Sequence, residues 1–282
     1  MTDNILQNFK FKKKFGQNFL TDTNLLSAIV KDAKVQEDDC VLEIGTGAGA
    51  LTEQICKACP KGKVISIEID NTLKDYLTEK FNRTQNLEII FGDILKIDKN
   101  IIKEKFNNKP FKVVANLPYY ISSPIIFYLI ESDFNLSGIT VMLQKELVDR
   151  ITAKPGGKDY GAISVVLGLY GNAKKTRDVP RQLFTPMPNV DSAILSIEIE
   201  NKNLDIKNIS KVTKMCFAMR RKTITNNLMQ GLNLSRQETE NIVKSCNIDV
   251  SIRAEKLSIT DYVLLTKKLE DFLNEGASNT KN

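Results

Sequence analysis

Short apolar runs alternate with helical patterns between residues 39 and 199. Runs of four to eight apolar residues are typical of buried strands, and apolar positions three and four apart are typical of helices. The predicted strands are Cys40–Ile44, Val64–Glu68, Leu87–Phe91, Lys112–Ala115, Ile139–Leu143 and Ser192–Ile199. The predicted helices in this part are Thr21–Ala33, Leu51–Cys59, Thr72–Phe81 and Pro124–Glu131. Such alternation favours an α/β fold with a mostly parallel sheet.

The pattern changes near residue 200. The strand Ser192–Ile199 alternates apolar and polar residues in its second half, as an antiparallel or edge strand does. Residues 201–205 form a polar linker, and helical spacing then predicts Ile209–Met229, Arg236–Cys246 and Thr260–Asn274. We therefore expect an α/β domain over residues 1–200 and a smaller, all-helical domain over residues 201–282.

Composition narrows the function. The chain has 282 residues, of which 42% are hydrophobic and 26% charged, the balance of an ordinary folded protein. No apolar run approaches the ~20 residues that span a membrane. The first fifteen residues lack the apolar core of a signal peptide and end in a basic run, so we expect a cytoplasmic protein without a membrane partner.

The chain contains no histidine. This excludes Ser-His-Asp hydrolysis, Cys-His proteolysis and histidine-ligated zinc catalysis. Its five cysteines are irregularly spaced, and the Cys56-x-x-Cys59 pair has no second ligand pair to complete a metal site. We expect these two thiols to serve packing and the protein to bind no metal.

Glycines and carboxylates follow successive predicted strands. The first strand runs into Gly45-Thr-Gly47-Ala-Gly49, which fits a nucleotide cofactor, a phosphate or simply a tight turn. Glu68 ends the second strand, where a carboxylate can accept both hydroxyls of a ribose, and Asp93 follows the third. Each acid taken alone is better explained as a helix cap or a surface acid. Together they indicate a site for an adenosine-containing cofactor.

The fourth strand leads into Asn116-Leu117-Pro118-Tyr119. An adenine amine is a poor nucleophile because its lone pair is delocalised into the ring. The Asn116 side-chain oxygen and the Leu117 carbonyl can accept its two hydrogens and favour a pyramidal nitrogen. Pro118 stiffens the turn, and Tyr119 offers a face on which a base can stack. The alternative is a strand-ending turn with a tyrosine in the core.

Two further segments point to nucleic acid. The Pro-rich segment from Phe184 to Ser192 can hold Phe184 out as a second stacking face, or can be anchored by a core phenylalanine. Arg220, Arg221 and Lys222 lie in a row on the predicted helix, where they contact phosphates or form structural pairs. Of the net charge of +6, residues 201–282 hold +5, from 14 Lys or Arg and 9 Asp or Glu. A basic helical domain of this kind suits RNA.

These motifs occur in one order that resembles the ribosomal RNA adenine dimethyltransferase family, in particular its bacterial small-subunit branch. The resemblance covers about residues 10 to 270, and its more specific parts are Phe15-Gly-Gln-Asn-Phe-Leu20 and Asn116-Leu-Pro-Tyr119. Two positions depart from the family pattern: Tyr120 stands where asparagine is common, and Thr46 where proline is common. Neither departure removes a proposed acceptor, so they bear on cofactor affinity rather than on the reaction.

The resemblance implies a Rossmann-like S-adenosylmethionine methyltransferase sheet with an antiparallel edge strand and a helical RNA-binding domain. It implies dimethylation of two adjacent adenosines near the 3′ end of small-subunit rRNA, in an assembling 30S subunit, by a protein that we expect to be monomeric. The residues it assigns to the cofactor are Asn18, Leu20, Gly45, Glu68, Asp93 and Asn116.

Three rival functions stay open. A related large-subunit rRNA methyltransferase shares the chemistry, but Gly16-Gln17 and the segment around Phe184 favour the small-subunit reaction. A DNA adenine methyltransferase is less favoured because no segment is suited to reading duplex sequence. A ribosome-assembly factor would bind RNA through the helical domain, with methylation secondary.

Overall fold

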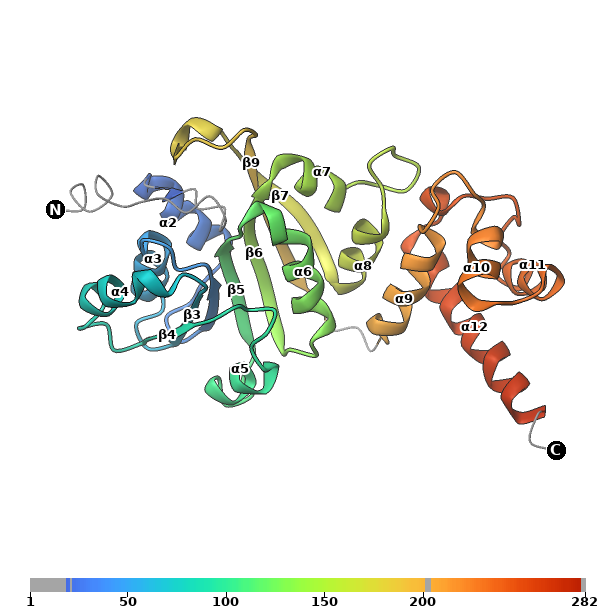
Figure 1. The fold of residues 1–282 in the computed structure, drawn as a ribbon, viewed down its shortest axis with the longest axis horizontal. Coiled ribbons are helices and arrows are strands. Elements are labelled where there is room, and N and C mark those ends of the chain that lie inside the picture. Colours follow the sequence, from blue (N-terminus) through green and yellow to red (C-terminus); the bar gives the residue numbers. More distant parts are fainter. Residues whose placement is uncertain (1–18, 21, 201–203, 280–282) are drawn as a thin grey trace. The chain divides into compact units, whose positions relative to one another are not determined.

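The computed structural model describes residues 19–20, 22–200 and 204–279 and divides the chain into two compact units (Figure 1). The first unit comprises the chain up to Val148 together with Lys174–Ile199, and the second comprises Asp149–Ala173 and the chain from Glu200 onward. The sequence predicted a single boundary at residue 200. The structure differs because residues 149–173 pack with the C-terminal helices.

The first unit is built on a seven-stranded sheet in the order β4-β3-β2-β5-β6-β9-β7. Its strands are β2 (Cys40–Ile44), β3 (Lys63–Glu68), β4 (Leu87–Phe91), β5 (Phe111–Asn116), β6 (Leu136–Gln144), β7 (Gly171–Val179) and β9 (Ser192–Ile199). Strands β2 to β6 pair in parallel, as predicted, and β9 runs antiparallel to β6. All six predicted strands are confirmed.

Strand β7 was not predicted. It lies at the edge of the sheet beyond β9, and most of its residues are exposed. Its sequence is mostly charged and polar, with Lys174, Lys175 and Arg177 where an apolar alternation would mark a strand. Edge strands of natural sheets commonly carry such charges because they discourage pairing with another chain. The expected edge strand, β9, is antiparallel but internal.

The helices of the first unit are α2 (Thr23–Asp32), α3 (Ala50–Ala58), α4 (Lys74–Lys80), α5 (Lys99–Lys105), α6 (Ser122–Glu131) and α7 (Lys145–Ile151), whose last three residues belong to the second unit. Of these, α2, α3, α4 and α6 lie where helices were predicted, whereas α5 and α7 were not predicted. Asp22 caps α2 by accepting from the backbone N–H groups of Asn24 and Leu25. A short antiparallel pair joins β1 (Phe19–Leu20) to β8 (Phe184–Thr185).

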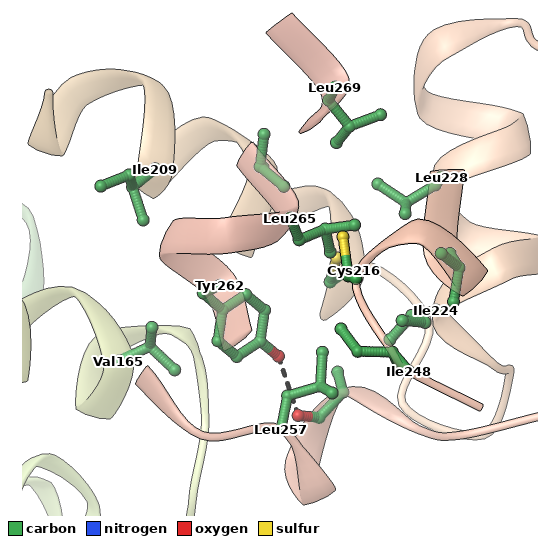
Figure 2. Close-up of a cluster of buried hydrophobic side chains, with 14 of the residues drawn as sticks. Val165, Ile209, Cys216, Ile224, Leu228, Ile248, Leu257, Tyr262, Leu265 and Leu269 are labelled. Atoms are coloured by element: carbon green, nitrogen blue, oxygen red, sulfur yellow. Dashed lines mark hydrogen bonds between the residues drawn. The ribbon is translucent and has the colours of Figure 1, made fainter. Parts of the chain in front are cut away.

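The second unit is helical. It contains α8 (Ala162–Tyr170), α9 (Ile206–Cys216), α10 (Ile224–Leu232), α11 (Arg236–Ser245) and α12 (Ile259–Asn279). Figure 2 shows its core, in which the buried Tyr262 lies among aliphatic side chains and donates to the Ala254 carbonyl at 2.8 Å. Val165 and Leu169 of α8 belong to the same core. This packing explains why residues 149–173 group with the C-terminal helices.

The single helix predicted over Ile209–Met229 is wrong. The structure breaks it into α9 and α10, with a turn over residues 217–223. Thr223 caps α10 by accepting from the Asn226 N–H, and a side chain that caps a helix in this way marks a new beginning. The three cations at 220–222 therefore lie in a turn rather than on a helix.

Among the residues that the structure describes, no helix is both long and apolar enough to span a bilayer.

Candidate active site

Four parallel neighbours bring the predicted site residues to one edge of the sheet. Strands β4, β3, β2 and β5 are adjacent, and parallel pairing places their carboxyl ends together. The glycine-rich loop follows β2, Glu68 ends β3, Asp93 follows β4 and Asn116 ends β5. Open α/β sheets bind ligands at this edge. All these residues belong to the first unit.

The glycine-rich loop, residues 45–49, has a backbone that requires glycine. Gly45, Gly47 and Gly49 have φ angles of +86°, +55° and +78°, which L side chains rarely adopt. The Gly45 N–H donates to the Ile67 carbonyl of β3 at 2.8 Å. A Cβ on Gly45 would lie 3.6 Å from the Asn116 carbonyl oxygen. The loop is therefore tied to β3 and lies directly beside the end of β5.

Glu68 is linked to the same loop. Its carboxylate accepts from the Gly47 N–H and from the Asp70 N–H, each at 2.8 Å. The residue is only 4% exposed, and burial raises the pKa of its carboxyl. Each carboxylate oxygen has a second lone pair, so the group retains capacity for further donors. The geometry thus places an acceptor directly beside the loop.

Sequence reasoning missed the role of Glu43, which begins the glycine motif. Its side chain is fully buried, and its Oε2 accepts from the Thr52 hydroxyl at 2.7 Å and the Ser66 hydroxyl at 2.5 Å. Ser66 in turn pairs with the Thr46 hydroxyl at 2.6 Å. Glu43 thereby connects β2, β3, α3 and the loop. The spacing of Thr46 and Thr52 after Glu43 was the available sequence signal.

Burial raises the pKa of Glu43 to about 8, and its other oxygen, Oε1, has no hydrogen-bond partner. A neutral carboxylic acid tolerates such a site better than a carboxylate does. Burial therefore favours the protonated form of Glu43 in the folded protein.

Glu43 should make stability depend on pH. Its pKa in the folded protein lies above the ordinary 4.5, so its stabilising contribution is complete below pH 4.5 and is lost as pH rises to about 8. Glu43→Gln cannot ionise. At each pH we compare the melting temperature of Glu43→Gln with that of wild type. We expect the difference to rise by several degrees in favour of the variant across that interval, and to stay constant at higher pH. Parallel melting curves across the interval would contradict this assignment.

Asp93 follows β4 in a short turn. Its side chain accepts from the Leu95 N–H at 3.0 Å and lies 3.8 Å from the Lys96 ammonium, and the side chain is 26% exposed. The preceding Gly92 N–H donates to the Glu68 carbonyl at 2.8 Å. Asp93 is therefore a turn-stabilising acid that also stands next to Glu68.

The last residue of β5 and the three that follow it, Asn116 to Tyr119, form a fixed turn. Asn116 is partly exposed, whereas the Leu117 side chain is buried and its N–H donates to the Met142 carbonyl at 3.2 Å. The Pro118 carbonyl accepts from the Ser122 hydroxyl at 2.9 Å. Tyr119 begins a short 3-10 turn, Tyr119–Ile121, and its hydroxyl pairs with the Ser192 hydroxyl at 2.5 Å.

Ser192 was not predicted as a site residue. It begins β9 and is fully buried, and its contact fixes the orientation of the half-buried Tyr119 ring. The residues are 73 positions apart, so no local pattern in the sequence predicts their contact.

The structure corrects the prediction for Phe184. Its side chain is only 3% exposed and packs in the core of the first unit, and its residue pairs with Leu20 in the β1–β8 ladder. It is an anchor of the Pro-rich loop and not an open stacking face. Leu20 is likewise buried at 5%, so only its main chain remains for a ligand. Asn18 lies outside the described residues.

The predicted cations Arg220, Arg221 and Lys222 are exposed in the second unit. Arg220 is partly structural because it donates to the Lys158 carbonyl at 2.6 Å. That contact joins the turn to a second loop, residues 154–158. This loop carries the exposed Lys154 and Lys158, which sequence reasoning had not singled out.

A third basic segment joins this loop. The Gly156 N–H donates to the Glu255 carbonyl at 2.7 Å, and the Lys256 ammonium lies 3.8 Å from a Cβ built on Gly156. Three segments distant in the sequence thus place exposed cations around one loop.

The cysteines are free thiols. Burial raises the pKa of Cys56 to about 12 and that of Cys59 to about 11, so neither forms a reactive thiolate near neutral pH. Within the described chain, no cluster of three or more potential metal ligands occurs.

Comparison with known proteins places this chain in a family. The model of the ribosomal RNA adenine dimethylase family matches residues 8–271. The ribosomal RNA small subunit methyltransferase A of Clostridioides difficile (strain 630) is 41% identical over 265 residues, covering 92% of this chain and 91% of the relative. The protein of that name from Streptococcus thermophilus (strain CNRZ 1066) is 42% identical over 274 residues, covering 93% of each chain.

Solved structures agree on the architecture. A dimethyladenosine transferase from Plasmodium falciparum has a TM-score of 0.75 at 25% identity, over 92% of this chain and 98% of that one. The 23S rRNA methyltransferase ErmE shares the fold, with a TM-score of 0.65 at 24% identity over 90% of this chain and all of its own. On the extent of the family match and the identity to its relatives, this chain belongs to the ribosomal RNA adenine dimethylase family.

Proposed function

We propose that this protein uses S-adenosylmethionine to dimethylate the exocyclic amines of two adjacent adenosines near the 3′ end of small-subunit rRNA, in an assembling 30S subunit. The family and the names of the relatives support this function. One structural observation carries it: the glycine-rich loop lies directly beside the Asn116 carbonyl. A loop suited to a nucleotide cofactor and a motif suited to an adenine amine therefore share one sheet edge.

The residues at this edge suit S-adenosylmethionine. Glu68 provides carboxylate oxygens for the ribose hydroxyls, and Asp93 provides an acceptor for the adenine amino group. Gly45 has no side chain to obstruct a ligand that approaches this edge beside Asn116. Leu20 would contribute main-chain contacts, and Asn18 the methionine end. When bound, the cofactor supplies an electrophilic methyl group on a sulfonium sulfur.

The protein activates the adenine amine by holding it. The Asn116 side-chain oxygen and the Leu117 carbonyl accept its two hydrogens, so that the nitrogen lone pair turns away from the ring. Displacement at a methyl carbon needs the attacking nitrogen in line with the leaving sulfur, and such positioning supplies several kcal/mol of catalysis. The nitrogen becomes acidic once it is methylated and loses its proton to water. This chemistry suits a chain without histidine.

Tyr119 holds the base after it leaves its stack. Extracting a base costs a few kcal/mol, and stacking on an aromatic ring returns about 1–3 kcal/mol. The hydrogen bond to Ser192 keeps the ring in one orientation. Pro118, with its φ of −64°, holds the turn that carries both Leu117 and Tyr119.

The second methyl transfer should depend on Tyr119 more than the first. A monomethylated amine has one hydrogen left, so Asn116 and the Leu117 carbonyl cannot both be satisfied and stacking carries more of the binding. We expect Tyr119→Ala to slow the second transfer about ten-fold more than the first. Single-turnover mass spectrometry of mono- and dimethyladenosine measures this ratio. Tyr119→Phe keeps the ring and should leave the ratio of the two transfer rates as in wild type. Equal losses in both steps for Tyr119→Ala would contradict the hypothesis.

The second unit is the proposed RNA-binding domain. Its exposed cations on three segments, Lys154 and Lys158, Arg221 and Lys222, and Lys256, suit contacts with phosphates. Arg220 supports this surface by its bond to the Lys158 carbonyl. We expect the protein to act as a monomer, since the described residues of one chain supply every proposed contact except that of Asn18. We expect it to act in the cytoplasm, because the proposed substrate is an assembling 30S subunit.

Mass spectrometry of undermethylated small subunits, incubated with the protein and S-adenosylmethionine, tests the function. We expect dimethyladenosine at two adjacent positions, and little product on large subunits. Product on large subunits alone would favour the 23S-type reaction instead. Free rRNA in a parallel reaction tells whether the assembling subunit is required.

A ribosome-assembly role is separated from catalysis by Asn116→Ala. If this variant restored subunit assembly in cells without methylating, RNA binding would be the more important activity of the protein.

A further inference from the structure

Two side chains of α4 donate hydrogen bonds to the backbone of the glycine-rich loop. The Lys80 ammonium donates to the Ala48 carbonyl at 2.7 Å, and the Tyr76 hydroxyl donates to the same oxygen at 3.2 Å. Lys80 and Tyr76 are four residues apart, so they stand on one face of α4. Two donors from one helix therefore converge on a single carbonyl of the loop.

Lys80 is committed to this contact. Its ammonium lies over the rings of Phe81 and Tyr76, 5.3 Å and 5.9 Å from their centroids, and burial lowers its pKa. No carboxylate forms an ion pair with it within the described part of the chain. Lys80 also lines an open depression of about 590 Å³, shared with Lys57 and Arg83, so water is available on that side. The ammonium nevertheless points to the backbone of the loop.

The Ala48 carbonyl belongs to a peptide that is free to flip unless it is held. A flip of this peptide changes ψ of Ala48 and φ of Gly49; the φ of Gly49 is +78°, and glycine adopts the opposite sign of φ at little cost. The N–H of the same planar peptide, that of Gly49, donates to the Thr46 carbonyl at 2.9 Å. Lys80 and Tyr76 hold one end of the peptide and Thr46 holds the other.

The side chains at the end of α4 pack so closely against the loop that no side chain would fit at Gly49. A Cβ on Gly49 would lie 2.6 Å from the Phe81 ring and 3.3 Å from the Lys80 ammonium. Phe81 follows Lys80 directly, so the two side chains enclose the end of the loop where α3 begins. A flipped peptide would exchange a hydrogen-bond donor and an acceptor in the loop that we propose to bind the cofactor.

We propose that Lys80 is a positioning residue for S-adenosylmethionine: with Tyr76, it locks the Ala48–Gly49 peptide in the orientation that the cofactor requires. The inference rests on the proposed function of the loop and adds two residues outside the motifs that the sequence singled out. Lys80 acts through the loop rather than by touching the reacting atoms. Its loss should therefore weaken cofactor binding and leave the chemical step of a saturated enzyme largely intact.

Titration calorimetry with S-adenosylmethionine, together with turnover on undermethylated small subunits, tests this role. We expect Lys80→Met to raise the cofactor Kd about ten-fold and to change kcat at saturating cofactor less than about two-fold. Tyr76→Phe, which loses the weaker donor, should raise Kd about two-fold to three-fold. Lys80→Arg retains a cationic donor and should recover most of the affinity.

The matched control is Lys57→Met. Lys57 lines the same depression, but its ammonium pairs with Glu53 at 2.7 Å rather than with the loop. The Kd of Lys57→Met for S-adenosylmethionine should therefore equal that of wild type. A Kd for Lys80→Met equal to wild type, or a loss confined to kcat, would overturn the inference. If Lys80→Met does not fold, Tyr76→Phe decides: a Kd raised about two-fold to three-fold with kcat unchanged supports the inference, and a Kd equal to wild type overturns it. A wild-type protein that binds no cofactor would contradict the proposed function itself.

Discussion

Asn116→Ala is expected to slow methyl transfer by about a hundred-fold to a thousand-fold at saturating cofactor and RNA. The variant removes one of two acceptors that hold the amine hydrogens, and that grip is needed when the nitrogen lone pair attacks. The Leu117 carbonyl remains, so substrate binding should fall much less. Single-turnover transfer to undermethylated small subunits measures the effect.

Asn116→Asp is the matched variant. It keeps an oxygen acceptor of similar reach and adds a negative charge beside a nitrogen that becomes positive. We expect it to retain more activity than Asn116→Ala. Transfer by Asn116→Ala at more than a tenth of the wild-type rate would contradict the proposed role of the side chain.

The central strands that carry the site were predictable because they are buried. Cys40–Ile44 matches the structure residue for residue and is buried in all but its first residue, since a parallel sheet under helices demands continuous apolar runs. Leu87–Phe91 also matches, although it lies at the edge of the sheet and its residues are only partly buried. The order of motifs then followed from one rule, that parallel strands end at the same edge. The edge strand β7 escaped prediction because its charged residues serve solubility rather than burial.

The errors arose where tertiary contacts decide. The residues on either side of 217–223 have helical spacing, yet the cap at Thr223 and its packing divide them into two helices. Phe184 lies in a Pro-rich segment whose sequence is typical of an exposed loop. Its pairing with Leu20 instead places the Phe184 side chain in the core. Neither the cap nor the pairing can be read from the local pattern of apolar residues.

The supporting contacts of the site were the least predictable. Ser192 reaches Tyr119 across 73 residues, and Lys80 reaches Ala48 across 32. Glu43 could be recognised from the sequence as the first residue of the glycine motif. Its burial and its hydrogen bond with Ser66 result from the pairing of β2 with β3. Sequence patterns bring the proposed ligand-binding groups to one edge of the sheet, but they do not predict the contacts that hold those groups in place.

Glu68→Ala is expected to weaken S-adenosylmethionine binding by about a hundred-fold or more. A carboxylate that accepts both ribose hydroxyls makes two charge-assisted hydrogen bonds, each worth about 1.5–3 kcal/mol. The variant also releases the Gly47 N–H, so the loop loses one of its anchors. Glu88→Ala is the control, because Glu88 on the neighbouring β4 pairs with Lys63 at 3.5 Å and with Lys105, away from the loop.

The central claim is that the edge formed by β2 to β5 binds the methyl donor beside Asn116. Calorimetric titration of the wild-type protein, Glu68→Ala and Glu88→Ala with S-adenosylmethionine tests it most directly. We predict one equivalent bound by the wild type and by Glu88→Ala with equal affinity, and binding about a hundred-fold weaker for Glu68→Ala. A wild-type protein that binds no cofactor, or a Glu68→Ala variant that binds it as tightly as wild type, would contradict this assignment.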